Sequence, residues 1–440
     1  MQPFSDRRAR FAEAIPNAVA VIPGAAVRLR NNDAEYEFRQ DSDFHYLTGF
    51  PEPDAILVIL PKGAKERSVL FVPPRDRAME VWNGKRYGPE GALASFDVDA
   101  AYDIAEFDAR LPDYLTGAHT LYYRLGEDER LDRRIQAALA AARVRVRRGG
   151  NAPQTIEEPG TLLHEMRLRK TPQEIETMRR ACAITRLGHV AGMRATRPGM
   201  YEYELEAIIE HAYHTNGAQD LAYPSIVAGG DNATTLHYHA NRALLHGGEL
   251  VLVDSGCELD LYASDVTRTW PVDGRFSAEQ RAIYEIVLAA QKAGIAQVRP
   301  GNPFSAYHEA ALRTIVNGLL DIGLLNGTLD ENLESKKYKD YFMHRTGHWI
   351  GLDVHDVGHY LESDGTTSRK LEPGMVVTVE PGIYVHRDLT CDERFKGIGV
   401  RIEDDILCTP SGPENLSDAI PKEIAEIESI VGADALAHAN

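Results

Sequence analysis

Four carboxylates and one histidine in the C-terminal half of the chain could together bind metal ions. They are Asp254, Asp265, His348, Glu380 and Glu403. Each acid lies within or beside a short run of apolar, β-branched residues, where an unpartnered carboxylate is costly. Four carboxylates in one place raise one another's pKa and favour protonation. Two divalent cations would cancel the four charges, so the set is typical of a two-metal hydrolase.

The acids are predicted to lie on two hairpins, two on each. If Asp254 and Asp265 occupy opposite arms of a hairpin, the turn centres on Leu259 and Asp260. Residues paired across a hairpin point to the same face of the sheet, so both carboxylates would face one side. The second pair of acids ends two further strand-like runs, which a longer polar stretch joins.

A histidine-rich segment between the two acid pairs supplies further candidates. His344 and His348 are four residues apart, His355 follows seven later, and His237 lies upstream. Histidine is the commonest metal ligand and the side chain best suited to proton transfer near neutral pH. Taken singly, each could instead be a hydrogen-bonded structural histidine, as each Asp after a strand could be a turn or cap residue. Their occurrence together in one region favours a site.

Six blocks of the sequence resemble aminopeptidase P and, more distantly, prolidase and methionine aminopeptidase. They are Val-Leu-Val-Asp-Ser-Gly-Cys-Glu at 251–258, Ser-Asp-Val-Thr-Arg-Thr-Trp-Pro at 264–271, Gly-His-Trp-Ile-Gly-Leu-Asp-Val-His at 347–355, Thr-Val-Glu-Pro-Gly-Ile-Tyr at 378–384, Gly-Val-Arg-Ile-Glu-Asp-Asp at 399–405, and 39–54 near the N-terminus. The resemblance covers nearly the whole chain. It implies an α/β N-terminal domain followed by an α+β catalytic domain of the pita-bread (creatinase/aminopeptidase) type.

The resemblance also implies a role for each candidate residue. Asp254, Asp265, His348, Glu380 and Glu403 match the ligands of a dinuclear centre, in which Asp265 and Glu403 bridge the ions. Other residues that match the family's site are His237, His344, His355, Arg401, Tyr384 and Tyr223. The histidines would bind substrate and stabilise the tetrahedral intermediate. Arg401 lies two residues from Glu403 and would share its strand face.

The ligand types predict the chemistry. An oxygen-rich donor set with one imidazole suits hard or borderline ions such as manganese, and the resemblance also implies Mn²⁺. Two ions would hold a bridging hydroxide as nucleophile, with Glu380 taking its proton and His355 or His237 donating to the oxyanion. The substrate follows from the resemblance alone: an exopeptidase would remove the N-terminal residue of peptides with proline at the second position.

Two other functions stay open on the sequence. A prolidase restricted to Xaa-Pro dipeptides would use the same metal chemistry, although the block at 39–54 favours an aminopeptidase. A metal-free binding protein on the same fold would have lost one or more ligands, whereas all five are present here.

Sequence patterns place a domain boundary near residue 160, which separates an aminopeptidase P-like N-terminal domain (1–160) from a metallopeptidase catalytic domain (161–440). The N-terminal part mixes strand-like runs with a helix, predicted at 18–22, 55–60, 68–72 and 131–143. In the C-terminal part, Thr171 and Ser277 are predicted to cap two helices, because each is followed by Glu or Gln three residues later. These helices should end near Met193 and Pro300.

Composition narrows the partners and the compartment. With 48 Lys and Arg against 66 Asp and Glu, the net charge is −18, which argues against nucleic acid and anionic membranes as partners. The four cysteines, at positions 182, 257, 391 and 408, show no paired spacing, and Cys257 is expected to be a small buried side chain rather than a ligand. Neither an apolar signal segment nor a long apolar run is present, so a cytoplasmic protein is expected.

The resemblance further implies a homo-oligomer, a dimer or a tetramer, in which the N-terminal domain forms subunit contacts. Trp82 matches a tryptophan of the family that reaches the site of another protomer. An ordinary, partly buried tryptophan is the alternative for this position.

Overall fold

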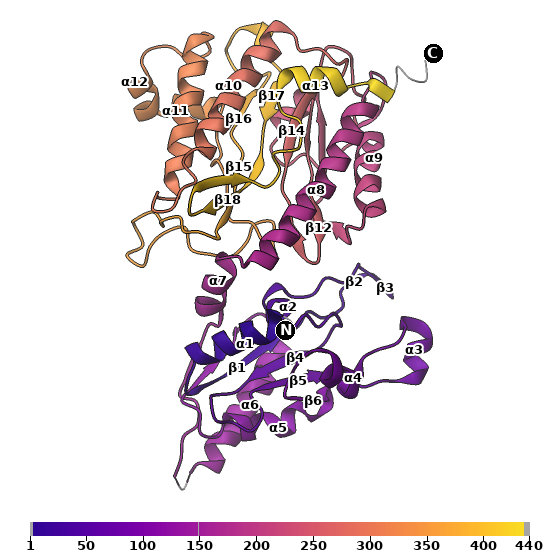
Figure 1. Cartoon of the computed structure of the whole chain (residues 1–440), viewed down its shortest axis with the longest axis vertical. Coiled ribbons are helices and arrows are strands. Elements are labelled where there is room, and N and C mark those ends of the chain that lie inside the picture. The colour runs from indigo at the N-terminus through magenta and orange to yellow at the C-terminus, as the bar shows by residue number, and fades with distance from the viewer. Residues whose placement is uncertain (1–2, 148, 435–440) are drawn as a thin grey trace. The chain divides into compact units, whose positions relative to one another are not determined.

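The computed structural model describes residues 3–147 and 149–434 and divides the chain into two compact units, Met1–Met166 and Arg167–Asn440 (Figure 1). The boundary between the units along the chain falls within helix α7 (Gly160–Leu168). Among the described residues, no helix has the length and apolar character needed to cross a membrane.

The N-terminal unit is built on a six-stranded mixed sheet in the order β6-β5-β4-β1-β7-β8. Its strands, with a separate β2–β3 hairpin, are β1 (Ala18–Pro23), β2 (Leu29–Asn31), β3 (Ala34–Glu35), β4 (Ile56–Ile59), β5 (Ser68–Val72), β6 (Ala100–Asp103), β7 (Thr120–Tyr122) and β8 (Thr155–Glu157). Its helices are α1 (Pro3–Ala14), α2 (Ser42–Thr48), α3 (Arg77–Asn83), α4 (Gly88–Ser95), α5 (Phe107–Leu115) and α6 (Glu129–Arg145). The predicted α/β character is confirmed, including the three strands and the helix expected from the apolar runs.

The C-terminal unit contains strands between two pairs of helices (Figure 1). The strands are β9 (Asp220–Leu221), β10 (Ile226–Gly229), β11 (Leu250–Asp254), β12 (Cys257–Leu259), β13 (Tyr262–Ala263), β14 (Thr267–Pro271), β15 (Val376–Val379), β16 (Gly382–Val385), β17 (Ile398–Arg401), β18 (Asp404–Thr409) and β19 (Gly412–Asn415). The helices are α8 (Pro172–Ala195), α9 (Glu202–Thr215), α10 (Ala278–Ile295), α11 (Ser305–Asp321), α12 (Leu329–Ser335) and α13 (Ile424–Ile430). Helices α8 and α9 form one pair and α10 and α11 the other.

The two predicted helix caps are present. Thr171 and Ser277 each form a capping box. The cap hydroxyl accepts from the backbone N–H three residues later, and the Glu or Gln side chain at that position accepts from the backbone N–H of the cap residue. Helix α8 ends at Ala195, close to the prediction, whereas α10 ends at Ile295, about one turn before Pro300.

The first predicted hairpin, which carries the candidate ligands Asp254 and Asp265, exists, but its predicted register is wrong. Asp254 lies opposite Thr267, and the turn centres on Asp260 and Leu261, whose φ values are 50° and 64°. Two left-handed residues make a tight two-residue turn, and this moves the pairing away from the expected one. Because the partner of Asp254 shifts by two residues, side-chain alternation still leaves Asp254 and Asp265 on one face.

The second hairpin is interrupted where its two candidate ligands lie. β15 pairs with β18 and β16 with β17, in a register that continues across the break from Val379–Asp404 to Gly382–Arg401. Glu380 and Glu403 therefore lie opposite each other in the gap between the two pairs of strands.

Candidate metal centre

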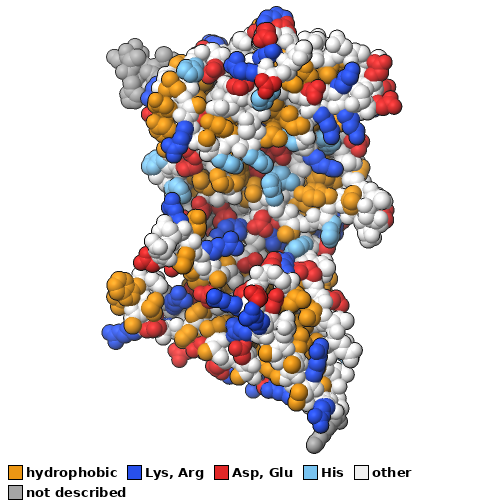
Figure 2. Space-filling view, turned by 180° about the vertical axis from the view of Figure 1, so that it is seen from behind, with side chains coloured by type: hydrophobic (Ala, Val, Ile, Leu, Met, Phe, Trp, Pro, Cys, Tyr) orange, Lys and Arg blue, Asp and Glu red, His pale blue; other side chains and the backbone are white. Residues whose placement is uncertain are grey.

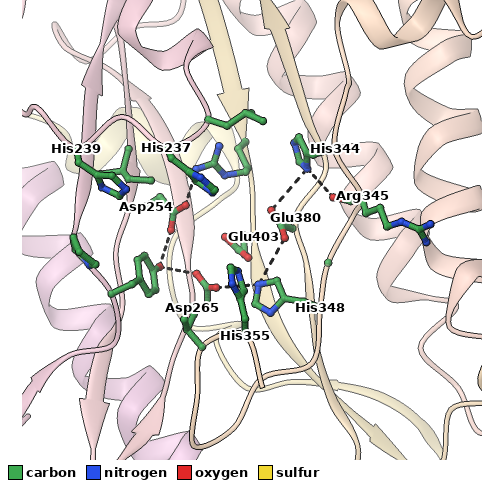
Figure 3. A pocket seen from close by; sticks show the side chains of 17 residues that line it. His237, His239, Asp254, Asp265, His344, Arg345, His348, His355, Glu380 and Glu403 are labelled. Atoms are coloured by element: carbon green, nitrogen blue, oxygen red, sulfur yellow. Dashed lines mark hydrogen bonds and ion pairs between the residues drawn. The ribbon is translucent and has the colours of Figure 1, made fainter. Parts of the chain in front are cut away.

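A cavity of about 550 Å³ in the C-terminal unit brings the predicted residues together. Of the eleven site residues expected from the sequence, all but Tyr384 line it; these are Tyr223, His237, Asp254, Asp265, His344, His348, His355, Glu380, Arg401 and Glu403. Figure 3 shows the four carboxylates turned toward a common centre. Five of the lining residues are histidines, and histidine side chains also gather in a band on one face of the molecule (Figure 2).

Three of the expected ligands form a compact group. One donor atom from each of Asp265, His348 and Glu403 lies within 4.8 Å of the other two. Glu380 is next to this group, because its Oε1 is 3.8 Å from Nε2 of His348. Asp254 lies on the far side of Asp265, where the Tyr223 hydroxyl is 2.6 Å from Oδ1 of both aspartates.

The orientation of His348 suits a metal ligand. Its Nδ1 donates to the Trp349 carbonyl oxygen at 2.9 Å, which leaves Nε2 directed at Asp265 Oδ2, 3.3 Å away. A backbone bond to one ring nitrogen is the usual way of fixing the other as a ligand. Gly347 allows the close approach, since a Cβ there would lie 2.0 Å from the Thr378 carbonyl oxygen.

The charges of the site are unbalanced without cations. Burial and the neighbouring carboxylates raise the pKa of Glu403 well above its usual value, and burial raises the pKa of Glu380 to about 7. Burial lowers the pKa of His348, but the bond to Asp265 and the nearby acids outweigh it and raise the value to about 9. Buried acids with raised pKa values beside an oriented imidazole are the donors that divalent ions favour, so these residues fit two such ions.

Behind the candidate ligands, Arg401 links several residues of the cavity. Its Nη2 donates to Asp254 Oδ2 at 2.6 Å and its Nη1 to the Tyr384 hydroxyl at 3.0 Å. That hydroxyl lies 2.9 Å from Nε2 of His344, whose Nδ1 donates to the Arg345 carbonyl oxygen. Tyr384, which the resemblance placed near the substrate, therefore contacts the site through Arg401 and His344.

The loop that carries His355 is held by buried charges. His355 packs edge-on against His348, with ring centroids 4.4 Å apart. The next residue, Asp356, accepts from Lys170 Nζ at 3.0 Å and Arg167 Nη2 at 2.6 Å. The side chains of Lys170 and Asp356 are both 1% exposed. This ion cluster fixes a loop that has neither helix nor strand.

Sequence reasoning missed several residues at the cavity. His239, Arg345, Leu236, Ile226, Pro224 and Val354 also line it, and the Thr267 hydroxyl donates to Glu403 Oε2 at 2.6 Å. Strand alternation could have identified Thr267, since it lies two residues from Asp265. In Figure 3 the Arg345 side chain points away from the carboxylates. Cys257 is buried and free, as expected.

Two family models match the chain. Metallopeptidase family M24 matches residues 176–410, and the aminopeptidase P N-terminal domain matches residues 4–122. The first match contains every residue of the cavity, and the second lies in the unit with the six-stranded sheet.

Known proteins are similar over the full length. Xaa-Pro aminopeptidase of Haemophilus influenzae is 44% identical over 429 residues, which cover 97% of this chain and 96% of that one. The solved Pseudomonas aeruginosa aminopeptidase PepP has a TM-score of 0.95 at 44% identity and covers 99% of this chain and 98% of its own. A variant of Escherichia coli aminopeptidase P in complex with substrate has a TM-score of 0.94 at 41% identity, with 99% of both chains covered.

Proposed function

Since this chain belongs to the aminopeptidase P group of metallopeptidase family M24 and has the pita-bread catalytic fold, we propose that the cavity described above is its active site. The chain is a metal-dependent Xaa-Pro aminopeptidase, which acts on peptides with proline at the second position. We assign the binding of two divalent ions to Asp254, Asp265, His348, Glu380 and Glu403.

The observation that carries the assignment is the compact donor group. Donor atoms of Asp265, His348 and Glu403 all lie within 4.8 Å of one another, a spacing that one ion can span. Asp254 and Glu380 flank the group on opposite sides and supply the remaining charge. Asp265 and Glu403 both belong to the compact group, which supports ligand roles for both.

Manganese is the ion that we propose. Four carboxylates and one imidazole suit hard or borderline ions, and thiolates are missing from the residues that line the cavity. Divalent ions bound there supply Lewis acidity, which lowers the pKa of water and polarises a carbonyl group.

The protein's own groups supply binding and proton transfer. Glu380 is assigned as the proton acceptor, because its carboxylate faces both the donor group and His344, 3.9 Å away. His237 and His355 line the cavity and can donate to an oxygen that gains negative charge. Arg401 holds Asp254 in place through the bond at 2.6 Å.

The substrate bond explains why a dedicated site is needed. An Xaa-Pro bond has no N–H and proline restricts φ, so a peptidase that binds its substrate as an added strand loses a hydrogen bond there. A site whose histidines donate to the carbonyl oxygen would not depend on that N–H.

Metal removal and substrate length test the proposal together. Apoenzyme should be inactive on an Xaa-Pro-Pro tripeptide, and activity should return with Mn²⁺ and less fully with Mg²⁺ or Ca²⁺. Turnover that persists in chelator would refute the metal assignment. Activity on Xaa-Pro but not on Xaa-Pro-Pro would instead favour a prolidase.

We also propose that the protein is a cytoplasmic homo-oligomer, a dimer or a tetramer. The four cysteines are free, which suits a reducing compartment. In α3 the neighbouring residues Val81 and Trp82 are 80% and 83% exposed, which corrects the alternative of a partly buried tryptophan and gives an adjacent apolar pair that a contact between copies would cover. A second copy of the chain is the occupant that we assign to this surface.

A further inference from the structure

Thr267 connects the metal centre to the residues behind it. Its side chain is fully buried, and it lies at the start of β14 directly opposite Asp254. The hydroxyl donates to Glu403 Oε2 at 2.6 Å and accepts from Arg401 Nε at 3.1 Å. In the backbone, Glu403 N donates to the Thr267 carbonyl oxygen at 3.0 Å. Thr267 thus contacts Glu403 through both its main chain and its side chain.

The direction of these bonds is fixed by the groups that make them. A guanidinium can only donate, so the Thr267 hydroxyl oxygen must accept from Arg401. The single hydroxyl proton is then directed to Glu403. Because Arg401 also donates to Asp254 Oδ2 at 2.6 Å, one hydroxyl joins the two acids into a single hydrogen-bonded chain.

Glu403 needs such a contact. It lies in the gap between β17 and β18, where ladder bonds are interrupted. The residue is 2% exposed and its carboxylate has three other acids nearby, namely Asp254, Asp265 and Glu380. Their repulsion favours rotation of the carboxylate away from the centre when no ion is bound. A hydrogen bond to Oε2 opposes this rotation.

We propose that Thr267 is a positioning residue of the metal centre, which holds the Glu403 carboxylate toward Asp265 and His348 before the ions bind. The inference rests on the proposed role of Glu403 as a ligand. Residues that orient ligands in this way change metal affinity by about 10- to 100-fold. A residue that only fills space would change stability and leave affinity as it is.

The experiment measures the affinity of apoenzyme for Mn²⁺ by calorimetry, together with its thermal unfolding. Thr267→Val keeps the shape but removes the hydroxyl, and should weaken Mn²⁺ binding by about 10- to 100-fold. Thr267→Ser keeps the hydroxyl and should bind close to wild type. If Thr267→Val does not fold, Thr267→Ala is measured in its place, because it removes the same hydroxyl.

Thr269 provides a matched control on the same strand and the same face. Its hydroxyl donates to the Arg401 carbonyl oxygen at 3.0 Å and accepts from Arg401 N at 3.3 Å. Thr269→Val should lower the melting temperature in the same way as Thr267→Val while leaving Mn²⁺ affinity within about threefold of wild type, since it makes no bond to a proposed ligand.

Glu403→Gln separates the two proposals. If this variant binds Mn²⁺ as wild type does, Glu403 is not a ligand and the proposed function loses part of its site. If Glu403→Gln binds weakly but folded Thr267→Val binds as wild type, only the positioning role of Thr267 is wrong.

Discussion

At the scale of single residues, His189 shows how burial couples folding to pH. His189 is fully buried on α8 and its Nε2 donates to the Ser255 carbonyl oxygen at 3.0 Å. Burial lowers the pKa of His189 to about 4, below the value near 6.5 of an unfolded chain. The unfolded state therefore binds a proton first as the pH falls. The stability that neutral His189 contributes is complete above about pH 6.5 and is lost between there and about pH 4.

His189→Gln should remove this pH dependence, because glutamine can still donate to Ser255 but does not titrate. Between pH 7 and pH 5, wild type should lose about 2 kcal/mol more free energy of unfolding than the variant. Urea unfolding of both proteins at the two pH values measures the difference. Equal losses would show that His189 does not titrate on unfolding in this range.

The proposed ligands stand out in the sequence because each is an acid in an apolar run or a histidine beside one. Thr267 was less evident. It is β-branched and so typical of an ordinary sheet residue; alternation places it on the face of Asp265, but only its contact with Glu403 indicates a role at the site. Arg401 could be placed on the face of Glu403 by alternation. Its bond to Asp254 joins two hairpins, and the sequence does not show how the two hairpins pack against each other.

At the scale of elements, the loop around His355 depends on Asp356. Burial works against its charge, but Lys170 and Arg167 hold the pKa of Asp356 below its usual value. Asp356→Asn removes the negative charge that faces both cations. Breaking a buried ion pair costs about 3–5 kcal/mol, so the melting temperature of the catalytic unit should fall clearly in calorimetry.

Asp364→Asn is the control for this change. Asp364 belongs to the same long connection but is exposed, and its carboxylate accepts from the backbone of Thr366 and Thr367. An amide oxygen can accept the two backbone bonds, and the exposed Thr367 hydroxyl, which donates to the other carboxylate oxygen, can turn to accept from the amide nitrogen, so stability should change by less than about 1 kcal/mol. Equal effects of the two substitutions would contradict a special role for the Asp356 cluster.

The elements themselves were largely predictable, whereas their register was not. The capped helices follow from local signals at Thr171 and Ser277. The turn at Asp260 and Leu261 has left-handed residues without the Asn-Gly or Asp-Gly pair that usually marks such a turn, so the sequence did not reveal where the hairpin folds back. The face shared by Asp254 and Asp265 was still correct because it depends only on parity.

At the scale of the whole molecule, the exposed apolar residues of α3 predict assembly. Trp82→Glu should shift the mass in analytical ultracentrifugation toward the monomer, because a buried charge would be costly in a contact between copies. Val144→Glu places the same charge at an exposed position of α6 and should leave the mass unchanged. An unchanged mass in both variants would contradict the proposal, because it would show that Trp82 does not lie in a contact between copies.

The pairing register is the same on both sides of the Glu380–Glu403 gap. This register determines where an insertion or a deletion can be tolerated. An insertion of one residue at 386–397, which connects β16 to β17, can be absorbed by that connection. The same insertion at 398–403 would turn Glu403 to the opposite face, because neighbouring side chains in a strand alternate. Homologues should therefore vary in length in the connection and keep the number of residues between Ile398 and Glu403 constant.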